Sequence, residues 1–81
     1  MDNNTKWLTI EQVEERFILK KCSKEAEGEI IIPAGITDIG ADAFNGCDKI
    51  TSVHIPNGVQ TIGGHAFLYC GELKSVKLRS E

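Results

Sequence analysis

The side chains best suited to chemistry in this chain are three cysteines and two histidines. Cys22, Cys47 and Cys70 are separated by 25 and 23 residues. A zinc site draws its ligands from close pairs such as C-x-x-C or H-x-x-x-H, and neither pair occurs. Neither His54 nor His65 has a nearby serine or cysteine and a third orienting acid, as nucleophilic catalysis requires. The sequence therefore predicts no catalytic residue, no cofactor and no metal.

The cysteines have a simpler interpretation as packing residues. Cys47 and Cys70 occupy equivalent positions of the repeat described below, so their Cα atoms should lie about 5 Å apart, within reach of a disulfide. However, free cysteine packs as a small apolar residue, and an odd number of cysteines argues against a disulfide framework. Cys22 lies outside the repeat and is expected to be partly exposed. An enzyme with Cys22 as its nucleophile therefore stays a rival hypothesis.

Two adjacent copies of a 23-residue unit make up most of the chain. They span residues 32–54 and 55–77, and residues 78–81 begin a third unit. A fixed period of this length is the signature of a solenoid, in which each unit buries its apolar face against its neighbours. The two units are identical at ten positions: Ile32/Ile55, Pro33/Pro56, Gly35/Gly58, Ile39/Ile62, Gly40/Gly63, Ala43/Ala66, Phe44/Phe67, Cys47/Cys70, Ser52/Ser75 and Val53/Val76.

Each unit contains a strand, a corner and a compact segment. Apolar and polar residues alternate from Val53 to Ile55, which predicts a strand with Val53 and Ile55 pointing inward. The proline that follows ends the strand. The later Ala-Phe-x-x-Cys segment is too short for an independent helix, and we expect one or two helical turns that stacking stabilises.

The pattern Ile-Pro-x-Gly-(Ile/Val)-x-x-Ile-Gly-x-x-Ala-Phe-x-x-Cys-x-x-(Ile/Leu)-x-x-Val resembles the BspA-type leucine-rich repeat over residues 32–78. The resemblance implies an α/β solenoid, with a small parallel sheet on one face and short helical turns on the other. It also implies binding of other macromolecules and no catalysis. The chain departs from the family in number, because relatives usually carry many repeats and this chain has two and a remnant.

Residues 1–31 are expected to cap the first coil. Thr9 and Gln12 form a capping-box pattern, and Ile10, Val13 and Phe17 would share one helical face, which predicts a helix at about residues 10–16. A strand at about residues 17–21 and a turn would follow. Such a cap would protect the edge of the first coil.

Charge and hydropathy exclude some classes of partner. The formal net charge of −3 comes from nine basic and twelve acidic residues without a basic cluster, so nucleic acid is not favoured. No apolar run reaches the length of a signal sequence or membrane span, so we expect no membrane insertion and a cytoplasmic location. The family resemblance points instead to the cell surface or exterior, if the chain is a fragment.

Positions at which the two units differ mark candidate binding surfaces. On the strand face, the outward columns form a candidate partner surface of Glu29, Ile31, Ser52, His54, Ser75 and Lys77. In the compact segment, Asn45-Gly46 of the first unit becomes Leu68-Tyr69 in the second. An apolar and an aromatic residue at outward positions are typical of a contact surface, or they fold over the end of the last coil.

The end of the second coil has no cover of its own after Leu78. This indicates self-association, a protein partner or a longer parent protein. The candidate self-association surface consists of Leu68, Tyr69, Leu73 and Leu78, and a homo-oligomer through this end is expected.

We therefore predict a non-enzymatic protein-binding module that presents a preformed surface to a protein partner or to its own copy. One alternative is a small stand-alone inhibitor or adaptor that blocks a larger host or defence complex. Another is a fragment of a cell-surface repeat adhesin, which would carry further 23-residue units.

Overall fold

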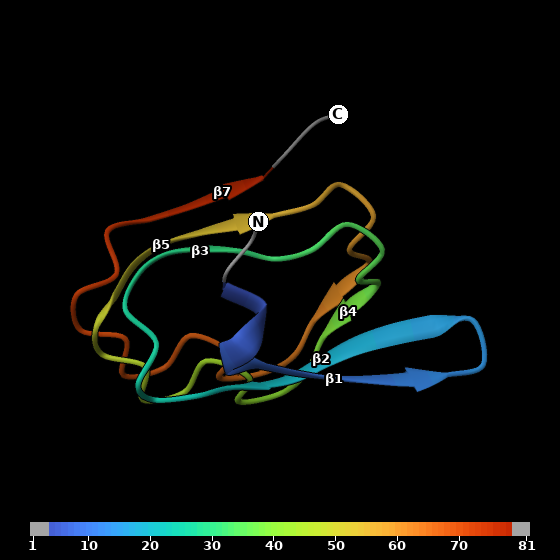
Figure 1. Ribbon diagram of the computed structural model, residues 1–81, viewed down its shortest axis with the longest axis horizontal. Helices are drawn as coiled ribbons and strands as arrows, with labels where there is room; N and C mark the ends of the chain where they lie inside the picture. The colour runs from blue at the N-terminus through green and yellow to red at the C-terminus, as the bar shows by residue number, and fades with distance from the viewer. Residues whose placement is uncertain (1–3, 79–81) are drawn as a thin grey trace.

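The computed structural model describes residues 4–78, which coil around one core between two sheets (Figure 1). A 3-10 helix, η1 (Asn4–Trp7), comes first. Sheet A contains β1 (Leu8–Val13), β2 (Arg16–Cys22), β4 (Asp38–Ile39) and β6 (Thr61–Ile62), in that spatial order. Sheet B contains β3 (Gly28–Ile31), β5 (Ile50–Ile55) and β7 (Ser75–Leu78), in that spatial order.

The core lies where the inward columns of the two sheets meet. Leu19 and Ile39 from sheet A and Ile30 and Val53 from sheet B are fully buried. The strands of sheet B pair in parallel, which confirms the predicted parallel sheet with Val53 and Ile55 inward. The coils therefore stack with the predicted 23-residue register.

The Ala-Phe-x-x-Cys segments are not helical turns, so the α/β assignment was wrong on this point. Residues 41–46 and 64–69 form consecutive β-turns. Within the first segment, the amides of Ala43, Asn45 and Cys47 each donate to a carbonyl three residues earlier. The rings of Phe44 and Phe67 stack with centroids 5.1 Å apart, as the equivalence of the coils predicts.

The intervening amides explain why no helix forms. Those of Asp42, Phe44 and Gly46 donate to the next coil, to the carbonyls of Gly64, Ala66 and Leu68 at 3.1, 2.7 and 2.9 Å. An α-helix would direct every amide to its own segment. Positive φ values of 61° at Asp42 and 82° at Gly46 also break the helical path.

The helix expected at about residues 10–16 is also absent, because this region is half of a β-hairpin. β1 pairs antiparallel with β2, and Glu14-Glu15 form the two-residue loop, with Glu14 at φ 56°. The β-branched residues Ile10 and Val13 suit a strand, and pairing with β2 outweighs a weak helical pattern. β1 thus covers the edge of β2, and the hairpin projects beyond the coils (Figure 1).

Residues 16–31, which we expected to be part of a cap, form a shortened coil. β2 pairs in parallel with β4, and β3 pairs in parallel with β5. The Cys22 amide donates to the Ala43 carbonyl, just as the Phe44 amide donates to that of Ala66. Cys22 therefore occupies the place of the repeat phenylalanine.

Gly63 allows the two coils to approach closely. A Cβ atom there would overlap the backbone nitrogen of Ala41 and lie 2.7 Å from its Cα. The adjacent Gly64 has no heavy atom within 4 Å of an added Cβ. The repeated glycine at this position thus has a steric reason, whereas its neighbour has none.

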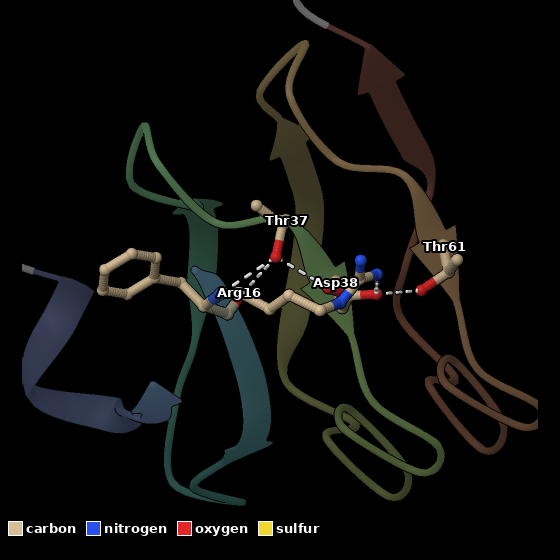
Figure 2. Close-up of polar contacts among 5 residues, drawn as sticks. Arg16, Thr37, Asp38 and Thr61 are labelled. Carbon is tan, nitrogen blue, oxygen red and sulfur yellow. Dashed lines mark hydrogen bonds and ion pairs between the residues drawn. The ribbon is translucent and has the colours of Figure 1, made fainter. Parts of the chain in front are cut away.

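One carboxylate joins three strands of sheet A (Figure 2). Asp38 accepts hydrogen bonds from Thr37 Oγ1 at 2.6 Å, from Thr61 Oγ1 at 2.5 Å and from Arg16 Nη2 at 2.5 Å. These bonds, that from Thr37 foremost, lower the pKa of Asp38 from 3.8 to about 2. The network ties β2, β4 and β6 together on the outer side of sheet A.

Gly63→Ala should strongly destabilise the protein, because the new methyl group meets backbone that cannot move without separating the coils. We expect a loss of about 3 kcal/mol in the free energy of unfolding, measured by urea denaturation with Trp7 fluorescence. Gly64→Ala is the matched control and should change stability by less than about 0.5 kcal/mol. Equal effects of the two substitutions would refute the close-approach explanation.

Asp38→Asn should flatten the acid dependence of stability. Because folding lowers the pKa of Asp38, its ionisation stabilises the native state above about pH 4, and this contribution is lost as the pH falls towards about 2. The urea midpoint of the wild type should therefore drop more between about pH 6 and about pH 3 than that of the variant. Asp48→Asn, at an exposed site, should keep the wild-type drop. An unchanged drop in Asp38→Asn would contradict this assignment.

Candidate functional site

The outward side of sheet B carries the candidate partner surface in the expected register. Ile31, His54 and Lys77 are aligned across the three strands, and so are Glu29, Ser52 and Ser75. Strand β3 contributes exposed Glu29 and Ile31, whereas His54 in the central strand is partly buried. The structure thus brings all six residues onto one face, which spans three coils.

Glu29 and His54 make a contact that the sequence analysis did not foresee. A carboxylate oxygen of Glu29 meets Nε2 of His54. The two residues are diagonal neighbours, because Glu29 lies opposite Ser52 and His54 opposite Ile31. The strand register could have revealed this pair, since diagonal side chains on one face lie within reach of each other.

The candidate self-association surface lies where the second coil has no neighbour among the described residues. Ile39, Val53 and Ile55 have exposed fractions of 1%, 0% and 2%. Their equivalents one unit later, Ile62, Val76 and Leu78, have 49%, 43% and 76%. We call this face the open end. It exposes the positions that coil stacking buries elsewhere.

The four residues expected to form the self-association surface differ in their surroundings. Leu78 is part of the open end, while Leu73 packs partly buried against the core. Leu68 and Tyr69 are exposed, the latter at 73%. Tyr69 has φ 60° at the position where Gly46 has φ 82°. A bulky residue in the left-handed region is strained, and such strain is concentrated at functional positions.

The cysteines are free and pack inside the coils. Cys47 Sγ lies 3.4 Å from the Cys22 carbonyl, and Cys70 Sγ lies 3.1 Å from that of Phe44. Cys22 is buried rather than partly exposed, so our expectation was wrong. Its burial raises the pKa of the thiol to about 12, and burial likewise raises the pKa values of Cys47 and Cys70. These thiols are poor nucleophiles at neutral pH.

The remaining candidates for chemistry lie apart. Nδ1 of His65 is 4.0 Å from a carboxylate oxygen of the repeat-equivalent Asp42, on the exposed turn segments. Within residues 4–78, no cluster of three or more His, Cys, Asp or Glu side chains is arranged to hold a metal ion. Nor does that part of the chain contain a helix with the length and apolar character needed to cross a bilayer.

The sequence analysis did not predict the hydrogen bonds of Asp38, although the alignment of the two units contains a signal for one of them. Asp38 and Thr61 are repeat equivalents, so the register places them on adjacent strands. A carboxylate beside a hydroxyl at equivalent positions predicts a hydrogen bond across the coils. Arg16 could not be found in this way, because the sequence of its coil does not match the unit.

Comparisons with solved structures identify two bacterial repeat proteins with a similar fold. A leucine-rich cell surface protein from Faecalibacterium prausnitzii A2-165 is 28% identical with a TM-score of 0.83, over 86% of this chain and 19% of that protein. A leucine-rich repeat protein from Bacteroides capillosus ATCC 29799 is 30% identical with a TM-score of 0.80, over 96% of this chain and 64% of that protein. The chain therefore spans less than two thirds of either one.

Sequence comparisons agree with the fold. None of the curated proteins matches the chain. The family model described as BspA type leucine-rich repeat region (6 copies) matches residues 15–81, so the match begins before the two clear units and includes the shortened coil of residues 16–31. With most of its length matched by this model, the chain belongs to the BspA-type leucine-rich repeat family.

Proposed function

We propose that the chain is a non-enzymatic protein-binding module that presents the outward face of sheet B to a protein partner. The observation that carries this proposal is the straight alignment of two side-chain columns across β3, β5 and β7. The parallel strands fix the backbone beneath these columns, so binding would cost little ordering of the main chain. A mixed surface with an exposed isoleucine, a histidine and both charge signs suits a protein partner better than nucleic acid.

The chemistry of the thiols supports the non-enzymatic assignment. The rival hypothesis of a Cys22 nucleophile requires an accessible thiolate. Cys22 has an exposed fraction of only 1%, and burial raises its thiol pKa to about 12. A thiol in this environment does not attack substrates without local opening of the coil.

The comparisons favour a location at the cell surface over the cytoplasmic location expected from the sequence. One structural neighbour is described as a cell surface protein. We therefore propose that the chain acts outside the cell as part of a repeat adhesin or receptor-like surface. The alternative of a stand-alone inhibitor or adaptor has no comparable support.

Photo-crosslinking tests the binding face. Benzoylphenylalanine replaces Lys77 on β7 or, as a matched control, Lys20 on β2, since both lysines are exposed strand residues. Each protein is mixed with biotinylated surface proteins from bacterial and epithelial cells and irradiated. We expect a discrete adduct from position 77 that excess unlabelled protein removes, and no such adduct from position 20.

Paired substitutions then identify the contributing side chains. For this step, benzoylphenylalanine replaces Ser75, because position 77 is substituted. The double variant Ile31→Glu with Lys77→Glu should give at least about tenfold less adduct, because interface anchors carry most of the binding energy. Ile10→Glu with Lys20→Glu makes the same changes on the β1–β2 hairpin and should leave the adduct intact. Equal yields from positions 77 and 20, or equal losses in the two double variants, would refute the proposal.

A further inference from the structure

Two asparagine–glycine pairs occur in the chain, Asn45-Gly46 and Asn57-Gly58. In such a pair the asparagine readily loses its side-chain amide, because glycine has no Cβ atom to hinder attack by its backbone nitrogen on the preceding side chain. The attack requires a backbone nitrogen that is accessible and is not held in a hydrogen bond. Both pairs contain the same reacting groups, so the fold decides which of them reacts.

The first pair is held in the row of bonds between the coils. The Gly46 amide donates to the Leu68 carbonyl at 2.9 Å. Nδ2 of Asn45 donates to Oδ1 of Asp42, also at 2.9 Å. Both residues of the pair are partly buried, and Cε of Lys24 lies 3.1 Å from the place that a Cβ atom on the glycine would take. The nitrogen of this pair can therefore attack only after the coils separate locally.

The second pair lies in the corner between β5 and β6 (Figure 1). Asn57 and Gly58 are both exposed. The corner is closed by a turn bond from the Val59 amide to the Pro56 carbonyl at 3.3 Å. Within residues 4–78, no acceptor meets the Gly58 amide. The attacking nitrogen of this pair is thus accessible without any opening of the coils.

The exposure of this corner does not depend on the open end. Ala34 and Gly35 are the equivalent residues of the first coil, which the second coil follows, and both are exposed as well. In the part of the chain that the structure describes, the Gly35 amide likewise meets no acceptor. A following coil therefore leaves a corner of this kind accessible, and the first corner lacks only the asparagine.

We propose that Asn57 is a site of deamidation and isoaspartate formation. The Gly58 nitrogen gives up its proton and attacks Cγ of Asn57. A new C–N bond closes a five-membered succinimide, and the side-chain nitrogen takes up a proton and leaves as ammonia. Water then adds to one of the two ring carbonyl carbons and breaks its bond to the ring nitrogen, which gives aspartate or isoaspartate. In sum, asparagine and water become an acidic residue and ammonia, and no oxidant is needed.

The product changes the corner in charge and in length. A carboxylate replaces a neutral amide, which makes the formal net charge of −3 one unit more negative. In the isoaspartate form, the main chain passes through Cγ and gains one methylene group before Gly58. Both changes are confined to an exposed corner, so the bonds between the coils stay intact. The site is independent of the face of sheet B and of its proposed partner.

The test follows both pairs in one sample of the full chain, kept folded in a mildly alkaline buffer. Trypsin cleaves after Lys24, Lys49 and Lys74, so the two asparagines lie on separate peptides, residues 25–49 and 50–74. Mass spectrometry of each peptide measures the conversion of amide to acid. Asn57 should convert at least about tenfold faster than Asn45, because the reaction of Asn45 requires local opening of the coils.

The same experiment in guanidinium chloride separates the effect of the fold from that of the sequence. In the unfolded chain, the two asparagines should convert at similar rates, because the bond from the Gly46 amide to the Leu68 carbonyl is lost. The denaturant is removed before digestion, so that both samples yield the same two peptides. A difference that persists in the unfolded chain would assign the effect to the neighbouring residues and overturn the proposal.

Gly58→Ala tests the attacking nitrogen. In the folded protein, this variant should convert Asn57 at least about tenfold more slowly, because the methyl group hinders the approach of the nitrogen to Cγ. The fold accommodates the methyl group, since the closest atom outside the neighbouring residues is the Ile36 carbonyl oxygen at 3.9 Å. An unchanged rate in this variant would overturn the proposal, and so would equal conversion of the two asparagines in the folded wild type.

Discussion

Backbone hydrogen bonds between successive coils are the interaction on which the rest of the structure depends. The compact segment of each unit divides its amides between two partners. Ala43 and Asn45 bond within their coil, while Asp42 and Phe44 bond to the next one. A single coil therefore leaves every second amide without a protein acceptor, and stacking is what completes it. Between the two full units the 23-residue period keeps this row aligned, while the shortened coil of residues 16–31 contributes the equivalent bond from Cys22 to Ala43.

Side chains at equivalent positions are adapted to this stacking. Gly63 lacks the Cβ atom that would overlap the backbone of Ala41, and the ring of Phe44 stacks on that of Phe67. The same positions are exposed in the second coil, which has no following coil among residues 4–78, as the contrast between Ile39 and Ile62 demonstrates. The groups that hold the coils together are thus also the groups that the last described coil exposes.

The repeat made the stacking predictable, but it did not determine the local conformation. The aligned columns of sheet B follow from two units in register, and so does the inward position of Val53. The prediction of helical turns was wrong because the short Ala-Phe-x-x-Cys segment is locally compatible with both a helix and β-turns. Every second amide of this segment donates to a carbonyl of the next coil, which selects the β-turns. The prediction of an N-terminal helix was wrong for a similar reason. Ile10 and Val13 fit the period of a helix or of a strand, and β2 provides a strand to pair with. In both places, hydrogen bonding to another strand or coil outweighs the local helical pattern.

Amide hydrogen exchange tests the role of coil-to-coil bonding most directly. Asp42, Phe44 and Gly46 donate to carbonyls of the following coil, and His65, Phe67 and Tyr69 are their repeat equivalents at the open end. In the isolated protein, the first three amides should exchange at least about a hundredfold more slowly than the second three, after correction for sequence. Equal protection of the two sets would mean that the open end is covered or that coil-to-coil bonds do not hold the segment, and it would contradict the structure's central feature.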